Sequence, residues 1–512
     1  MTETAGNGSP LVLKSARGRW VVVATILGSA MASLDATVVN IALPRIGADL
    51  GGGLTSLQWT VNAYTLTLAA FLLLGGSLGD RLGRRRIFVV GVVWFALASV
   101  GCALAPTSAL LIGARALQGV GGALLTPGSL AILEASFRKE DRAAAIGAWS
   151  GFAGIATAIG PFVGGWLIQS VSWRLIFVIN VPLGAAVIWL SLRHVPETSD
   201  PNAPTRPDLL GTALGALGLA GIVYALTEGP SKGWTAPIVL TSAILGVIAL
   251  AAFFVVQARS DHPILPLSIF KSAQFSAANA VTFVVYAALG GALFLLPIQL
   301  QRVVHYSPTA AGASLLPITA VMLVLSPRMG RLATRTGPRL PMTIGPIIAG
   351  AGILLLSQVG SGATYVADVL PGMTIFGLGL SATVAPLTAT VLAAAPSENA
   401  GVASAVNNDV ARTAQLIAVA VLPVAAGITS ASYAHPAEFS TGFERALLIA
   451  AGALAAGGVL AWLTIRRPLV EPEVPPMSSC PLDAPARGPA AACDWDPATA
   501  APVSASRAAA SG

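Results

Sequence analysis

Residues 20–44 read WVVVATILGSAMASLDATVVNIALP, an apolar run that contains one charged side chain, Asp35. About 20 apolar residues are enough for a helix to cross the hydrocarbon core of a bilayer. Basic residues precede the run, as they precede a signal peptide, but the run is longer than the apolar part of a signal peptide and further runs follow it. We therefore interpret it as a retained first transmembrane helix.

Thirteen more apolar runs of spanning length follow, which predicts fourteen transmembrane helices. A chain in lipid must satisfy its own backbone polar groups, and the alternating strands of about ten residues that a barrel would need are not visible. We predict an all-α integral membrane protein. The predicted helices are residues 20–44, 57–78, 87–104, 109–133, 143–168, 175–192, 209–226, 237–256, 275–296, 309–325, 340–357, 366–392, 400–428 and 443–465.

The composition and the loop charges agree with a membrane protein. Of the 512 residues, 55% are hydrophobic and 10% are charged, whereas soluble domains carry about 25% charged residues. If the N-terminus is cytoplasmic, twenty Lys and Arg side chains lie in the predicted cytoplasmic segments and five in the opposite loops. Because cytoplasmic loops carry such an excess, we expect a multi-pass protein of a bacterial plasma membrane with both termini in the cytoplasm.

Two linkers divide the predicted helices into three groups. Residues 194–208 (HVPETSDPNAPTRPD) are polar and Pro-rich, and a second loop covers residues 257–271. The composition of the last residues, rich in Pro, Ala and Ser, predicts disorder. We expect a cytoplasmic N-terminus (1–19), a six-helix bundle (20–195), a linker with two extra helices (196–270), a second six-helix bundle (271–467) and a disordered cytoplasmic tail (468–512).

An internal repeat relates the two bundles. Residues 76–85 read GSLGDRLGRR and follow the second predicted helix, and residues 330–339 read GRLATRTGPR and follow the tenth. Glycines and arginines match in register, but Thr334 stands where the first copy has Asp80. Parallel repeats around a central site are a common way to build secondary transporters.

Four stretches together resemble the fourteen-helix drug:proton antiporter branch of the major facilitator superfamily. They are residues 34–44 (LDATVVNIALP), 76–86, 115–123 (RALQGVGGA) and a series of glycines over 147–165. The resemblance implies the major facilitator fold, with two six-helix bundles and two extra central helices. It also implies a proton-coupled transporter that exports drugs or other small amphipathic compounds by alternating access and confers antibiotic resistance.

Asp35 and Arg115 are the candidates for proton coupling. Each is a charge inside a predicted helix, which is costly unless it is paired or hydrated. Asp35 lies nine residues from the outer end at Pro44 and Arg115 seven from Ser108, so their depths are about 13 and 10 Å and an interaction is feasible. The alternatives are a purely structural acid and a static ion pair.

Polar residues in other helices are candidates for substrate binding. Helix 400–428 carries Asn407, Asp409 and Arg412 near mid-membrane, and Asp409 and Arg412 are three residues apart. They can therefore neutralise each other on one helix face, which is the alternative to a role in proton or substrate binding. The predicted substrate-binding residues are Asp35, Asn40, Gln118, Asn407, Asp409 and Arg412. Trp59 and Tyr64 are interpreted as interfacial anchors.

Two of the resembling stretches are candidates for conformational switching. In residues 76–86 the glycines allow a tight turn and Asp80 can neutralise a nearby arginine. In helix 143–168, small residues at three- and four-residue spacing give a face that another helix can approach closely. A basic topogenic loop and ordinary tight packing are the alternatives. The predicted switch residues are Gly76, Asp80, Arg81, Gly83, Arg84, Gly151, Gly160, Pro161 and Gly164.

The alternative functions are transport of a metabolite or lipid by the same fold, and a membrane-embedded enzyme. An enzyme would need a catalytic cluster at the membrane face, whereas the four histidines are scattered singly in predicted loops. We therefore expect a transporter and not an enzyme, without a cofactor or a metal. Its expected partners are a small-molecule substrate, protons and the lipid bilayer, with no nucleic acid, and we expect a monomer.

Overall fold

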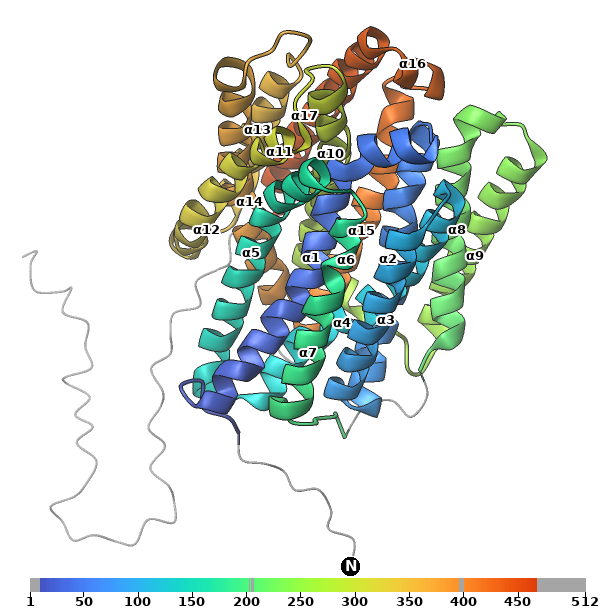
Figure 1. Cartoon of the computed structure of the whole chain (residues 1–512). Coiled ribbons are helices and arrows are strands. Elements are labelled where there is room, and N and C mark those ends of the chain that lie inside the picture. Colours follow the sequence, from blue (N-terminus) through green and yellow to red (C-terminus); the bar gives the residue numbers. More distant parts are fainter. Residues whose placement is uncertain (1–9, 202, 204–206, 396–399, 467–512) are drawn as a thin grey trace, which may run out of the picture. The chain divides into compact units, whose positions relative to one another are not determined.

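The computed structural model describes residues 10–466 apart from 202, 204–206 and 396–399, and this part of the chain is almost entirely helical (Figure 1). The predicted disordered tail, 468–512, lies outside the described residues. The elements are α1 (Ala16–Leu50), α2 (Leu54–Leu82), α3 (Arg84–Leu104), α4 (Ser108–Ser136), α5 (Lys139–Ser170), α6 (Leu175–Val178), α7 (Asn180–His194), α8 (Leu209–Lys232), α9 (Pro237–Arg259), η1 (Leu267–Lys271), α10 (Ala273–Arg302), α11 (Pro308–Ala313), α12 (Leu316–Thr336), α13 (Arg339–Leu356), η2 (Tyr365–Val369), α14 (Leu370–Ala393), α15 (Ala400–Ala425), α16 (Ser430–Ala434) and α17 (Pro436–Thr464).

Thirteen stretches of the described chain are long and apolar enough to cross a membrane. Three of them are interrupted helices, because α6 continues into α7, α11 into α12 and η2 into α14. The predicted span 400–428 is the remaining one and coincides with α15, which is 26 residues long. It is absent from the thirteen because Asn407, Asn408, Asp409 and Arg412 make it too polar. The described chain is thus an all-helical membrane protein.

Several helices extend beyond the predicted boundaries. The first span was predicted to end at Pro44, but α1 continues to Leu50. The second copy of the repeat, predicted to follow its helix, lies largely inside α12, which ends at Thr336. Apolar runs mark only the part of a helix that contacts hydrocarbon, whereas backbone hydrogen bonding continues the helix into the polar interface.

The helices form two bundles and a separate hairpin. Helices α1 to α7 pack on one another, and α10 to α17 pack on one another. Between them in sequence, α8 and α9 pair as a hairpin at the side of α2, and α8 also contacts α15 (Figure 1). Apolar side chains cover much of the outer surface of α9, as expected for a helix in contact with lipid.

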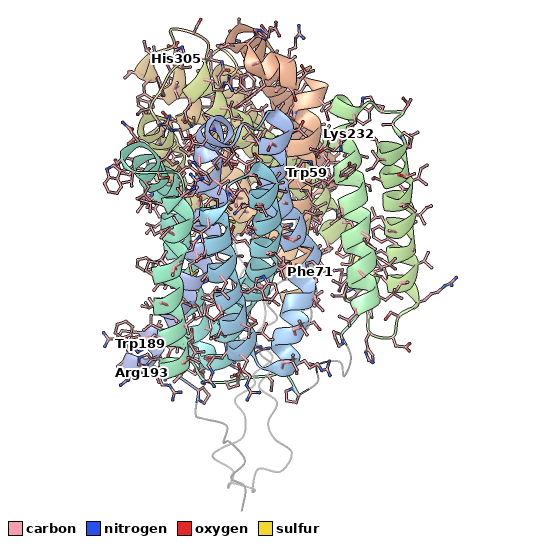
Figure 2. All side chains as sticks on the ribbon, turned by 45° about the vertical axis from the view of Figure 1, so that its right-hand side comes forward. Trp59, Phe71, Trp189, Arg193, Lys232 and His305 are labelled. Carbon is pink, nitrogen blue, oxygen red and sulfur yellow. The ribbon has the colours of Figure 1, made fainter. Side chains whose placement is uncertain are left out.

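The two bundles contact each other mainly toward one end, which we call the closed end and which holds the α1–α2 turn at residues 51–53. Here an apolar core cluster contains residues of both bundles, such as Ile46 of α1 and Leu422 of α15. A second cluster lies toward the opposite end, at the α2–α3 turn, and contains residues of the first bundle alone. We call this opposite end the open end. Figure 2 labels Trp59 and Lys232 toward the closed end and Trp189 and Arg193 at the open end.

Three hydrogen bonds join described residues of the two bundles, and all three lie toward the closed end. Gln58 Nε2 donates to the Val419 carbonyl oxygen at 2.8 Å. Gln301 Nε2 donates to the Ile41 carbonyl oxygen at 2.9 Å, and the Thr309 amide donates to the Gln169 side chain at 3.4 Å. The bundles are therefore held together at one end of the molecule.

Candidate transport site

Asp35 and Arg115 form an ion pair in the interior of the first bundle. The Arg115 Nη1 atom bonds to Asp35 Oδ2, and the two side chains are 1% and 0% exposed for Arg115 and Asp35 respectively. The predicted interaction between α1 and α4 is therefore present. Removing two charges from water is costly, so further hydrogen bonds are needed to hold such a pair.

Three more polar side chains surround the Asp35 carboxylate. Gln118 Nε2 donates to Asp35 Oδ1 at 2.8 Å and to Ser99 Oγ at 2.8 Å, and its Oε1 accepts from Arg115 at 2.6 Å. Asn180 Nδ2 lies 3.4 Å from Asp35 Oδ1 and 3.3 Å from Ser99 Oγ. We call Asp35, Arg115, Gln118, Ser99 and Asn180 the Asp35 cluster. It binds both carboxylate oxygens and joins α1, α3, α4 and α7.

The Asp35 cluster is also bonded to α2 through the guanidinium of Arg115. Its Nε donates to the Thr60 carbonyl oxygen at 3.1 Å, and its Cζ lies 4.3 Å from the centre of the Tyr64 ring. Tyr64 is 2% exposed, so its interpretation as an interfacial anchor is wrong. Trp59, one turn earlier, instead donates from Nε1 to Glu228 of α8 at 2.8 Å. The polar cluster at the centre of the bundle draws the Tyr64 ring inward.

The sequence analysis missed Ser99, Asn180 and Asn62. The first two look like single polar residues in apolar helices, and only the packing of α3 and α7 on α1 brings them to Asp35. Asn62 of α2 is 0% exposed, and both of its polar side-chain atoms are buried without a hydrogen-bond partner among the described residues. An amide in the middle of a predicted span is the signal that could have identified it.

The predicted substrate-binding residues lie in different places. Asn40 lies in α1 outside the Asp35 cluster, and its Oδ1 is buried without a described partner. In α15, Asn407 Nδ2 donates to Asn279 Oδ1 at 3.1 Å and to Thr282 Oγ1 at 2.8 Å, both in α10. Asn407 and Arg412 line a cavity of the second bundle, whereas Gln118 is part of the Asp35 cluster.

Asp409 and Arg412, which could neutralise each other on one helix face, interact electrostatically but do not bond to each other in this conformation. No ion pair joins them in the described structure, and Asp409 Oδ1 is buried without a hydrogen-bond partner there. Side chains three residues apart on a helix can meet, but Arg412 lines the cavity and Asp409 does not.

The α2–α3 turn consists of one residue, Gly83, with φ of 110°. Gly76 was predicted to belong to this turn but lies within α2. Asp80 and Arg84, predicted switch residues, form an ion pair of 2.8 Å across the turn. Arg81 is exposed.

Residues 195–200, predicted to be part of a linker, are bonded to this turn. The Arg84 amide donates to the Thr198 carbonyl at 2.8 Å, and the Asp200 amide donates to the Asp80 carbonyl at 2.8 Å. Glu197 accepts from the Arg85 amide at 3.0 Å and lies within 3.8 Å of the Arg86 Nε. The sequence analysis missed Glu197, because nothing in a polar linker indicates which turn it contacts.

We expect Gly83→Ala to be more harmful than Gly76→Ala. The backbone at residue 83 has a positive φ, which alanine adopts only at a cost of about 1–3 kcal/mol. A Cβ there would also lie 2.6 Å from Glu197 Oε1. A Cβ at residue 76 would be in a helix with its nearest neighbour at 3.6 Å, so alanine is tolerated or stabilising. Thermal unfolding of the two purified variants measures the difference, and equal melting temperatures would contradict it.

The predicted close-packing face of α5 exists in only part of the helix. A Cβ on Gly160 would lie 2.8 Å from Thr37 Oγ1, and one on Gly164 would lie 2.3 Å from Val38 Cγ1, both in α1. The Pro161 carbonyl oxygen faces Gly312 of α11 in the second bundle. Gly151 has no atom of a described residue within 4 Å of its Cβ position, so no described helix packs closely against it in this conformation. The space beside Gly151 is open because the two bundles contact each other toward the closed end.

Known proteins are similar to this chain over most of its length. The profile of the Major Facilitator Superfamily matches residues 25–419. The multidrug resistance protein Stp of Mycobacterium tuberculosis is 37% identical over 402 residues, which cover 78% of this chain and 74% of that protein. The methylenomycin A resistance protein of Streptomyces coelicolor is 36% identical, covering 87% and 92%, and the puromycin resistance protein of Streptomyces alboniger is 35% identical, covering 87% and 91%.

Solved structures show the same fold. A bacterial homologue of the lysosomal transporter Spinster has a TM-score of 0.61 at 17% identity, covering 88% of this chain and 98% of its own. A peptide transporter, POT, has a TM-score of 0.63 at 18% identity, covering 86% and 95%. Together with the profile match and the resistance proteins, this similarity shows that the chain is a multi-pass membrane transporter of the Major Facilitator Superfamily.

Proposed function

We propose that the chain is a proton-coupled exporter of small amphipathic compounds, including antibiotics, in a bacterial plasma membrane. The observation that carries the proposal is the Asp35 cluster, in which a carboxylate and a guanidinium are buried in the centre of the first bundle. Ionisable groups at such a depth are costly and mark ion pathways in membrane proteins. Relatives named for resistance to methylenomycin A and to puromycin support small organic compounds as cargo.

The predicted topology places both termini in the cytoplasm, so that the open end faces inward. The conformation is then inward-facing, with the outer ends of the bundles in contact. We propose that bundles 20–195 and 271–467 rock about the central site, and that the α2–α3 turn and the glycine face of α5 change contacts during this motion. The Cβ positions of the glycines at 147, 151 and 154 of α5 have no atom of a described residue within 4 Å, which leaves room for the inner ends to approach.

The proton acts on the Asp35–Arg115 pair. In the outward-facing state an external proton neutralises Asp35 and removes its attraction for the Arg115 guanidinium. In the inward-facing state Arg115, Gln118 and Asn180 bind the carboxylate, and we propose that the proton is then released to the cytoplasm. The same change in the bonding partners of Asp35 thus accounts for proton binding from outside and proton release inside.

A short segment of α2 connects the Asp35–Arg115 pair to the contact between the two bundles at the outer end. Arg115 bonds to the carbonyl of Thr60, and Gln58, two residues earlier, bonds to the carbonyl of Val419 in the second bundle. Protonation of Asp35 releases Arg115 and loosens the turn of α2 that holds α15. Opening of the outer end is thereby favoured when the external proton is bound.

We expect Gln58→Leu to open the outer end and to uncouple it from Asp35. One lost hydrogen bond, about 1 kcal/mol, raises the outward-open fraction about fivefold. Labelling of an introduced Thr309→Cys by an impermeant maleimide measures that fraction. Asp35→Asn should add nothing to the labelling of Gln58→Leu, but should add to that of the matched variant Gln301→Leu. Full additivity in both pairs would contradict the route through α2.

The function itself is tested with purified protein in proteoliposomes that contain a pH-sensitive dye. With an acidic interior, a panel of lipophilic compounds including puromycin is added outside. We expect uptake of a subset of these compounds together with alkalinisation of the interior, and loss of both with a protonophore. Uptake that ignores the pH gradient would refute proton coupling.

A further inference from the structure

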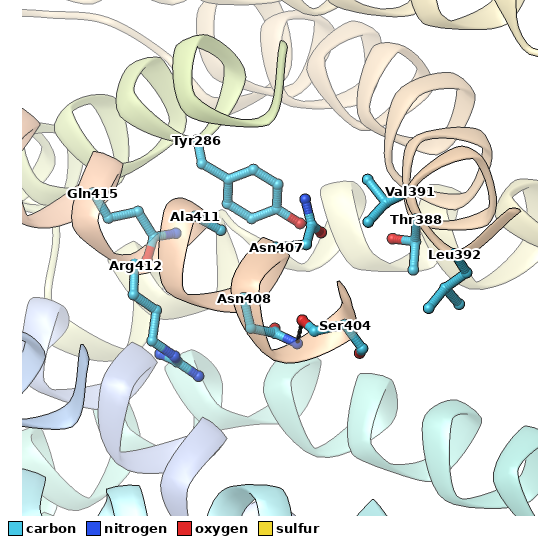
Figure 3. Close-up of a pocket in the computed structure, with 10 residues that line it drawn as sticks. All are labelled: Tyr286, Thr388, Val391, Leu392, Ser404, Asn407, Asn408, Ala411, Arg412 and Gln415. Carbon is cyan, nitrogen blue, oxygen red and sulfur yellow. Dashed lines mark hydrogen bonds between the residues drawn. The ribbon is translucent and has the colours of Figure 1, made fainter. Parts of the chain in front are cut away.

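The second bundle contains a cavity of about 170 Å³ with one charged side chain on its wall (Figure 3). The cavity is smaller than pockets for whole drug-sized ligands, which measure about 300–1,000 Å³, so it accommodates one part of such a ligand. It lies between α10, α14 and α15, toward the open end. Its lining residues are Tyr286, Thr388, Val391, Leu392, Ser404, Asn407, Asn408, Ala411, Arg412 and Gln415.

The charged side chain is Arg412, and it has no bonding partner in the described part of the chain. It is half-buried, and neither a hydrogen bond nor an ion pair joins it to a described residue. It lies twelve residues after the start of α15 at Ala400, a depth of about 18 Å. A guanidinium at that depth requires an anion or water.

The nearby acids among the described residues, Asp35 and Asp409, form no bond with Arg412 that could supply this anion. Asp35 is bound by Arg115, Gln118 and Asn180 in the other bundle. Asp409, on the same helix, neither pairs with Arg412 nor lines the cavity. The described wall of the cavity therefore offers a ligand one cation and no carboxylate.

We propose that this cavity binds the acidic group of an amphipathic organic anion, and that Arg412 selects for its charge. The inference rests on the proposed export function and gives its substrate class. A carboxylate, sulfonate or phenolate would form charge-assisted hydrogen bonds with the guanidinium. Figure 3 shows the apolar side chains of Val391 and Leu392 on the side of the cavity away from Arg412, where an aromatic or aliphatic part of the ligand fits.

The amide groups beside Arg412 suit the same ligand. Asn407 uses its Nδ2 for Asn279 and Thr282, which leaves its carbonyl oxygen for a hydroxyl or amide of the ligand. Gln415 and Tyr286 also line the cavity and carry polar groups. An acidic ligand with additional hydroxyl groups therefore matches the cavity better than a lipophilic cation does. The single carboxylate of the first bundle, Asp35, would by itself have suggested a cationic substrate.

The test compares two xanthene dyes of opposite charge, fluorescein (an anion) and tetramethylrhodamine methyl ester (a cation). Equilibrium dialysis against purified protein in detergent, corrected for empty micelles, measures their affinities at one pH. We expect fluorescein to bind more tightly. Arg412→Gln should weaken fluorescein binding about 10- to 100-fold and leave the cation unchanged or tighter. Arg412→Lys should retain part of the affinity.

A matched control and a transport assay complete the test. Asn408→Ala removes a neutral group of the same cavity and should affect both dyes alike. Arg412 has no described partner, so its variants should melt at the wild-type temperature. The inference is overturned if fluorescein does not bind more tightly than the cation, or if Arg412→Gln changes both dyes equally. Failure of pH-driven dye uptake with the binding preference intact would instead refute only the proposed export function.

Discussion

Asp35→Asn is expected to abolish the coupling of substrate movement to protons. Without a membrane potential, one proton exchanged for one substrate molecule allows a pH difference of two units to support a substrate gradient of about 100-fold. Asparagine has the shape of the acid but cannot release a proton, so accumulation should fall to about the level without a gradient. Uptake into proteoliposomes with an acidic interior measures this ratio directly.

A control variant separates coupling from folding. Asparagine at position 35 can still accept the bonds from Gln118 and Asn180. Arg115 loses its anion, which lowers the melting temperature, but it keeps its bonds to Gln118 and the Thr60 carbonyl. The variant should therefore remain folded and should exchange labelled substrate across the membrane without a pH gradient. Wild-type accumulation by Asp35→Asn would refute the role of the acid, and the structural-acid alternative would then hold.

Arg115→Gln is expected to cause the largest loss of stability. The variant leaves the Asp35 carboxylate buried without its cation, and breaking a buried pair in this way costs about 3–5 kcal/mol. It also removes the bond to the Thr60 carbonyl and the contact with the Tyr64 ring. Thermal unfolding in detergent should show a strongly lowered melting temperature, and transport should be lost.

The double variant Asp35→Asn with Arg115→Gln isolates the pair. Once the acid is neutral, the loss of the guanidinium no longer leaves an unpaired charge, so the double variant should be more stable than Arg115→Gln alone. Arg259→Gln, an exposed arginine at the end of α9, provides the reference for losing a positive charge and should change stability by less than about 0.5 kcal/mol. Simple additivity of the two substitutions would contradict an ion pair that stabilises the bundle.

The sequence was sufficient to predict the fold class and the membrane spans. Spanning length and apolar composition are local properties, so all but one of the predicted helices match a stretch that meets both criteria. The exception is α15, whose polar residues lower its apolar character, and three of these residues, Asn407, Asn408 and Arg412, also line the cavity. The Asp35–Arg115 pair was predictable because depth along a helix can be counted from its end at about 1.5 Å per residue.

The other contacts depend on how the helices pack, which local patterns do not encode. Rotation of α15 about its axis decided that Arg412 lines a cavity and that Asp409 does not. The packing of α3 and α7 on α1 added Ser99 and Asn180 to the acid, and folding of the linker placed Glu197 against Gly83. Charge and depth could be determined along a single helix, whereas partners are a property of several helices at once and required the tertiary structure.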